Sequence, residues 1–186
     1  GYICLSWGND TDHETVVGAT TGSGCNWVSP FVWDRTSGMR ILPGPEGHNC
    51  AGVAYAIRGN HIVGFCSSGW PETLACKWID GIQTLLKTTP NTLINVAVGV
   101  SIDGVIVGYG SLPGYSRVAL IWGNSNSGKL LATVAKERGI NLQGWTLEEA
   151  RAISLDGTII IGSASRNGMV QGFQLVLNYG QKTNSD

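Results

Sequence analysis

Large aromatic rings recur along the chain beside small or polar residues. Trp27, Trp70 and Tyr115 precede a second series of tryptophans, at positions 33, 78 and 122, by 6, 8 and 7 residues. A ring beside an amide or hydroxyl suits a sugar, because the C–H face of the sugar stacks on the ring while its hydroxyls bond the polar groups. We therefore expect a carbohydrate site at Trp27, Asn26, Trp70, Ser68, Tyr115 and Arg117. The alternative is that these rings pack between structural units.

Residues 123–129 follow most of a phosphate-binding loop pattern. Such a loop needs a Ser or Thr hydroxyl for magnesium directly after its lysine, and Leu130 stands there instead. The internal repeat of the chain makes this stretch a turn between two strands. We therefore predict that the chain binds no nucleotide and no other cofactor.

A second polar cluster surrounds His13, which lies beside Asp10, Asp12 and Glu14. Clustered carboxylates favour hard cations, but solvated loop charge accounts for the same residues and is the interpretation we adopt, with no metal site. The sequence contains no Gly-x-Ser-x-Gly elbow, and no Ser, His and Asp stand at a spacing that indicates a catalytic triad.

The cysteines leave two interpretations open. The five are Cys4, Cys25, Cys50, Cys66 and Cys76. Cys66 follows one expected strand and Cys76 opens the next, so antiparallel pairing would bring their Cβ atoms within reach of a disulfide. One interpretation is a Cys66–Cys76 bridge, and the other is free buried cysteines. Because no C-x-x-C pair is present, we do not expect structural zinc.

The elements that must position these residues repeat four times. A branched apolar run ends in a glycine with spacings of 46, 44 and 54 residues, and an alternating apolar segment follows with spacings of 45, 44 and 53. The glycines are Gly18, Gly64, Gly108 and Gly162, and the second landmarks are Phe31, Cys76, Leu120 and Phe173. Four units of about 45 residues, each with several short strands, are typical of a β-propeller. We predict an all-β fold, one propeller domain over residues 1–186, with units at about 1–48, 49–94, 95–148 and 149–179.

Each unit is predicted to run strand, tight turn, strand, loop, strand, turn, strand. Asp-Gly pairs at 103–104 and 156–157 indicate hairpins, because such turns demand positive φ; in the first unit we expect the turn over residues 8–12. Alternation places Trp33, Trp78 and Trp122 in the core. A short helix within 130–142, closed by Gly139, is expected in the third unit. The fourth unit stops after three strands and residues 180–186 are expected to fray, so the ring has four blades or is half of a larger one.

Composition narrows the function classes. Charged residues make up 13% of the 186, and 12 basic against 13 acidic residues give a net charge of −1. This balance provides no electrostatic footprint for nucleic acid or an anionic membrane, and no apolar run reaches the ~18 residues that span a bilayer. Low charge with much Gly, Ser, Thr and Asn suits an extracellular β-protein. No signal segment is visible and Gly1 is not an initiator methionine, so we expect a trimmed chain.

The unit motifs resemble those of a known bacterial family. Ser101-Ile-Asp103-Gly104 and Ser154-Leu-Asp156-Gly157 precede branched apolar runs, and Phe31-Val-Trp33 and Gly38-Met39-Arg-Ile-Leu42 follow one. In this order, and over nearly the whole chain, they resemble the family called "extracellular repeat, HAF". The His-Ala-Phe triplet that names the family is absent, with Ser29-Pro-Phe31 and Ala75-Cys76 in its place. The resemblance implies a propeller-like fold and a secreted or surface location, and it assigns no activity.

We therefore predict a non-enzymatic binding module, extracellular or on a bacterial cell surface, whose partner is a glycan or another cell-surface ligand. One alternative is a protein-interaction or assembly module, a passenger or adhesin segment that associates with itself. Another is an enzyme that acts on polysaccharide at the mouth of the ring. Such an enzyme needs a pair of carboxylates there; the acids near the inner hairpins are Glu14, Asp103 and Asp156, and turns explain the last two better.

Overall fold

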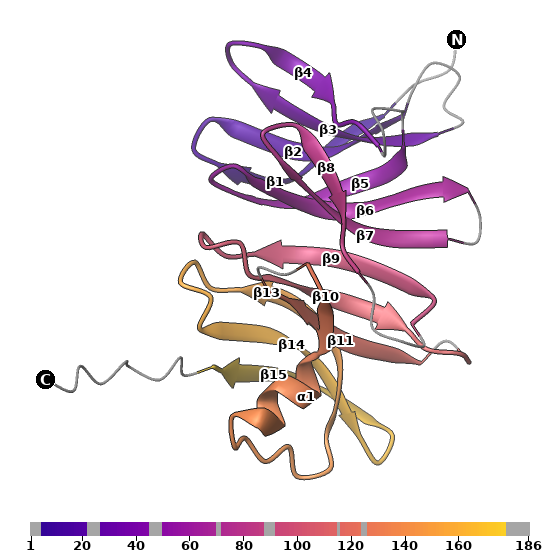
Figure 1. Ribbon diagram of the computed structural model, residues 1–186, viewed down its shortest axis with the longest axis vertical. Coiled ribbons are helices and arrows are strands. Elements are labelled where there is room, and N and C mark those ends of the chain that lie inside the picture. Colours follow the sequence, from indigo (N-terminus) through magenta and orange to yellow (C-terminus); the bar gives the residue numbers. More distant parts are fainter. Residues whose placement is uncertain are drawn as a thin grey trace, which may run out of the picture.

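The chain folds into antiparallel sheets that follow one another in sequence order (Figure 1). The computed structural model describes residues 5–21, 27–44, 50–69, 72–87, 92–114, 116–123 and 126–177. The predicted all-β character is confirmed, and so is the short helix in the third unit, α1 (Leu131–Glu137). Every strand pair within a unit is antiparallel.

The strands fall into four consecutive units along the chain. The first is β1 (Ser6–Asp12), β2 (Thr15–Thr21), β3 (Val28–Asp34) and β4 (Gly38–Ile41). The second is β5 (Ala51–Arg58), β6 (His61–Gly69), β7 (Glu72–Ile79) and β8 (Ile82–Leu85). The third is β9 (Ile94–Val100), β10 (Ile106–Ser111), β11 (Arg117–Trp122) and β12 (Gly128–Leu130). Two parallel bridges join it to the second, Thr73–Ile94 and Lys87–Ser127. The fourth is β13 (Thr146–Ile153), β14 (Ile159–Arg166) and β15 (Met169–Val176).

The hairpin turns agree with prediction in the third and fourth units and differ in the first. Gly104 and Gly157 take φ of 77° and 74° at the predicted turns. Residues 8–12, expected to be a turn, lie within β1, and the chain reverses at His13, whose φ is 52°. The strand continues because the Asp10 carboxylate accepts the backbone N–H of Ile57 at 3.0 Å, which ties β1 to the second unit.

Every first strand carries a β-bulge at the same place. The pairing with the second strand slips by one residue at the equivalent point of all four units, opposite the repeated glycine. The residues left unpaired there are Asn9, Tyr55, Val98 and Arg151, and β13 has a second bulge at Glu148. The repeated glycine lies opposite each bulge because the first strand comes very close there. A Cβ built at Gly64, for example, would overlap the carbonyl oxygen of Val53.

The core consists of three apolar clusters, each between two consecutive units. The valine before the repeated glycine lies on the face that meets the next unit, which we call the following face. Val17, Val63 and Val107 are each 0% exposed, whereas Ile161, at the same position in the fourth unit, is 48% exposed. The following face of the fourth unit is therefore uncovered among the described residues.

The opposite side of each unit, the preceding face, shows the same contrast. Trp78 and Trp122 are 0% exposed, and their indole N–H groups donate to the backbone carbonyls of Pro43 and Lys87 in the preceding unit. Trp33, predicted to be core, is 38% exposed. The prediction for Trp33 is wrong because no described unit packs against this face of the first sheet, which lies at one end of the stack in Figure 1.

Candidate functional site

The structure describes only part of the expected loop site. Asn26, Trp70 and Tyr115 lie outside the described residues, and Ser68 lies in β6 with its side chain outside the description. Trp27 is exposed just before β3. Arg117 opens β11, forms an ion pair with Glu149 and lies over the ring of Tyr109, 4.9 Å from its centroid. Trp27 and Arg117 belong to different sheets, and no contact joins them in the described part of the chain.

Three cysteines gather in the cluster between the first and second units. Cys50, Cys66 and Cys76 are buried free thiols, the second of the two interpretations that the sequence left open, and no Cys66–Cys76 bridge is formed. The Cys66 sulfur lies 3.3 Å from that of Cys76 and 2.6 Å from that of Cys50, because Cys50 precedes the strand that pairs with β6. The hydrogen bond to Cys66, together with burial, raises the pKa of the Cys50 thiol well above its usual range. Cys4 and Cys25 lie outside the described residues.

The remaining motifs have structural roles. β11 ends at Trp122 and β12 begins at Gly128, so the stretch 123–129 falls where the chain passes between two strands, and Lys129 pairs with Glu137 at 3.4 Å. Asp10 near His13 pairs with Arg58 at 2.6 Å. No group of three His, Cys, Asp or Glu side chains that could hold a metal ion occurs in the described ranges.

Carboxylates in two turns are held by local hydrogen bonds. The backbone N–H of Ser37, followed by nearby Arg40, lowers the pKa of Asp34. The hydroxyl of Ser154 and the backbone N–H of Thr158 lower the pKa of Asp156. Asp156 thus fixes the β13–β14 turn, which agrees with the structural role expected for it.

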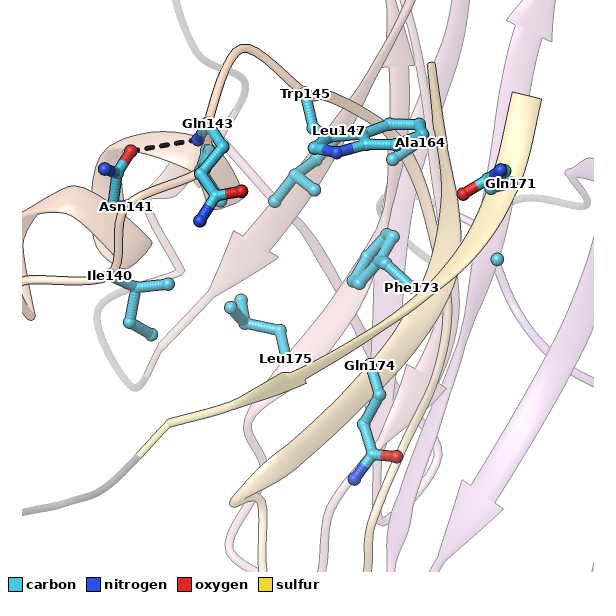
Figure 2. Close-up of a pocket in the computed structure, with 12 residues that line it drawn as sticks. Ile140, Asn141, Gln143, Trp145, Leu147, Ala164, Gln171, Phe173, Gln174 and Leu175 are labelled. Atoms are coloured by element: carbon cyan, nitrogen blue, oxygen red, sulfur yellow. Dashed lines mark hydrogen bonds between the residues drawn. The ribbon is translucent and has the colours of Figure 1, made fainter. Parts of the chain in front are cut away.

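A pocket of about 360 Å³ lies between the α1–β13 loop and the edge strand β15 (Figure 2). We call it the aromatic–amide pocket. Two rings face it, Trp145 from the loop and Phe173 from β15. The lining residues with amide side chains are Asn141 and Gln143 from the loop, and Gln171 and Gln174 from the strand. The side chain of Gln174 points away from the two rings, on the face of β15 that it shares with Ile161 of the neighbouring strand. None of its lining residues carries a charge, so it suits a neutral polar ligand.

Local hydrogen bonds build the loop wall of this pocket. The backbone N–H of Gln143 donates to Asn141 Oδ1 at 2.9 Å, and the N–H of Trp145 donates to the carbonyl of Leu142 at 2.9 Å. Gln143 and Gly144 take positive φ, which turns the chain sharply and carries Trp145 over β15. Within the described structure the indole N–H of Trp145 has no hydrogen-bond partner, so a ligand can accept it. On β15, residues 171 and 173 share one face, which puts Gln171 beside Phe173.

A second pocket, of about 340 Å³, is lined by all four units. Its walls are the four bulged residues of the first strands together with Tyr109 of β10. We call it the central pocket. Beside it, Glu149 is only 4% exposed and pairs with both Arg117 and Arg151. Burial, followed by the proximity of Tyr109, raises the pKa of Tyr55.

Sequence reasoning missed both pockets. Trp145 and the amides around it stood in a link between units, and their partner Phe173 lies in another strand 28 residues later. Glu149, the buried acid, is one of two adjacent glutamates, a pattern typical of exposed positions. The repeat alignment itself was the signal that could have found the central pocket, because its four bulged residues occupy equivalent positions.

No protein-family model matches the chain, and no curated protein matches it. In the described structure no helix has the length and apolar character needed to cross a membrane. The features that bear on function are therefore the two pockets and the sheet faces.

Proposed function

We propose that the four units are blades of a β-propeller, of the kind that the resemblance to the extracellular HAF repeats implies. Two features support this. Successive sheets pack face to face in chain order. The first strands of all four units contribute to one pocket, as inner strands around a central axis do. The open faces of the first and fourth units leave room for a larger ring.

We further propose that the protein is a non-enzymatic, extracellular or surface-exposed module that binds neutral carbohydrate in the aromatic–amide pocket. The observation that carries this proposal is the pairing of two rings with the amide side chains of Asn141, Gln143 and Gln171 in one uncharged pocket. Stacking of sugar C–H groups on Trp145 or Phe173 supplies apolar contact, and the amides supply both donors and acceptors for hydroxyls. This moves the proposed site from the inter-strand loops to the α1–β13 loop and β15.

A glycan array tests the proposal. The parent chain is expected to bind a neutral glycan, and the variant Gln171→Ala is expected to bind it about fivefold more weakly, because the lost hydrogen bond contributes roughly 1 kcal/mol. Gln171 is exposed on an edge strand, so the variant should keep the parent's circular dichroism spectrum.

Met169→Ala is the matched control for this experiment. Met169 lies on the same strand, is exposed and does not line the pocket. Equal loss of binding in this variant would mean that Gln171 acts only through the strand. Failure of the parent to bind any neutral glycan would contradict the carbohydrate proposal.

Self-assembly is a second candidate function, favoured by the two uncovered faces. Inside the chain, following and preceding faces pack against each other three times. The free following face around Ile161 therefore matches the free preceding face around Trp33, and the occupant that we propose is the first unit of a second copy. Such head-to-tail contacts build rings or open series of copies.

Sedimentation velocity over a range of concentrations tests this assembly. The parent is expected to self-associate, and Ile161→Arg is expected to be monomeric because a buried unpaired charge is costly. Ile82→Arg places the same charge on an isoleucine that is 72% exposed in the β7–β8 hairpin, and it should behave as the parent. A parent that stays monomeric, or an Ile161→Arg variant that still associates, would rule out this contact.

A further inference from the structure

The central pocket contains a positive charge that the proposed sugar site does not use. Arg151 is the bulged residue of β13, and a bulge re-aims its side chain away from the ladder. It lines the pocket with Asn9, Tyr55 and Tyr109. The arrangement is not local to one unit, because these four residues come from four different strands.

The charges around the pocket do not cancel. Glu149 forms ion pairs with Arg117 and with Arg151, so two guanidinium groups share one carboxylate. Glu149 is almost fully buried, whereas the side chains of Arg117 and Arg151 are 51% and 67% exposed. The carboxylate thus anchors both arginines and leaves one net positive charge with free N–H donors. The other acid beside the pocket, Asp10, is already paired with Arg58.

The uncharged groups of the pocket add directional hydrogen bonding. The Tyr55 phenol is protonated at neutral pH, as any tyrosine is, and burial raises its pKa further, so its O–H is a donor. The side-chain amide nitrogen of Asn9 donates a hydrogen bond to the carbonyl oxygen of Ala54 at 2.8 Å. The side-chain oxygen of Asn9 is therefore the atom that can accept a hydrogen bond from a ligand. A ligand that meets both groups presents one acceptor to Tyr55 and one hydroxyl to Asn9.

We propose that the central pocket binds a small hydroxy-carboxylate, whose carboxylate pairs with Arg151 and whose hydroxyl groups contact Asn9 and Tyr55. A guanidinium fork matches a carboxylate with two parallel hydrogen bonds, and a volume of about 340 Å³ is within the range of small-molecule sites. This site is separate from the aromatic–amide pocket, since the two share no lining residue. The proposal therefore stands or falls independently of neutral carbohydrate binding.

Isothermal titration calorimetry with D-glucuronate as the probe tests this site, with D-glucose as the uncharged counterpart. The parent is expected to bind glucuronate and not glucose at this site, with affinity that falls as salt rises. Arg151→Gln should weaken glucuronate binding roughly tenfold or more, because a hydrogen-bonded charge pair is lost. Arg166→Gln, on the same sheet and outside the pocket, is the matched control and should bind as the parent does.

A second variant separates recognition from a merely structural role of Arg151. Glu149→Gln removes the shared carboxylate, so both arginines become free and glucuronate should bind more tightly than to the parent. A structural role predicts loss of binding in both variants, whereas the proposal predicts opposite signs. Gln171→Ala should leave glucuronate binding unchanged, which distinguishes the two pockets. The proposal is overturned if the parent does not bind glucuronate, if glucose displaces glucuronate with equal affinity, or if Arg151→Gln has no effect.

Discussion

Replacing Gly64 by alanine is expected to lower the free energy of unfolding by about 4 kcal/mol or more, one of the largest effects that a single methyl group can have in this chain. The added Cβ would overlap the carbonyl oxygen of Val53, which is backbone and cannot rotate away. The β5–β6 pairing would have to open at the bulge, where Tyr55 enters the central pocket. Urea denaturation followed by tryptophan fluorescence measures the change.

Gly172→Ala is the matched control for this variant. Gly172 is also a strand glycine, but a Cβ there has only one neighbour within 4 Å, the carbonyl oxygen of Gly162 at 3.8 Å. The free energy of unfolding of the Gly172→Ala variant should rise by less than about 1 kcal/mol, because alanine restricts the conformations of the unfolded chain. Similar stabilities for Gly64→Ala and the parent would show that the bulge does not require glycine.

Replacing Trp122 by leucine is expected to cost about 3 kcal/mol of unfolding free energy. The ring is fully buried between the second and third units, and its removal leaves a cavity. The substitution also removes the donor to the carbonyl of Lys87, a hydrogen bond of 3.0 Å that joins the two units. Chemical denaturation of the purified variant gives the loss directly.

Trp33→Leu makes the same chemical change at the equivalent position of the first unit. Because Trp33 is partly exposed and makes no hydrogen bond among the described residues, the loss should be only about 1 kcal/mol. If the two variants lost equal stability, the preceding face of the first unit would be covered as fully as those of the second and third.

The repeat was predictable because it rests on local chemistry. A run of branched apolar residues favours a strand, and an Asp-Gly pair favours a tight turn. The number of units, the order of their strands and the helix over Leu131–Glu137 could therefore be predicted from residue types. The repeated glycines also mark equivalent positions in the four units. The physical reason for a glycine there is the close approach of the first strand at a bulge, and this depends on two strands at once.

Burial was predictable only where a neighbour exists. The alternation of apolar residues tells which face of a strand a residue occupies. It assigned Trp33 to the same face of its unit as Trp78 and Trp122. It does not tell whether another sheet covers that face. Ile161 and Trp33 are exposed for this reason, since they lie on the outer faces of the fourth and first units.

The candidate sites were the least predictable part. A bulge has no residue signature, and Asn9, Tyr55, Val98 and Arg151 differ in every property although they occupy one position of the repeat. Their shared environment is one pocket to which the first strands of all four units contribute. Aromatic residues near polar neighbours led to the carbohydrate hypothesis, but the pocket that we propose for it uses another ring, in the link before β13.

The most direct test of the proposed function is a proton–nitrogen NMR spectrum of the labelled protein, recorded with and without a neutral glycan that the array identifies. The seven tryptophans give seven indole N–H signals. We predict that the Trp145 signal moves on saturation with the glycan while those of buried Trp78 and Trp122 stay in place. Movement of Trp27 or Trp70 with Trp145 unchanged would contradict the aromatic–amide pocket and return the sugar site to the inter-strand loops.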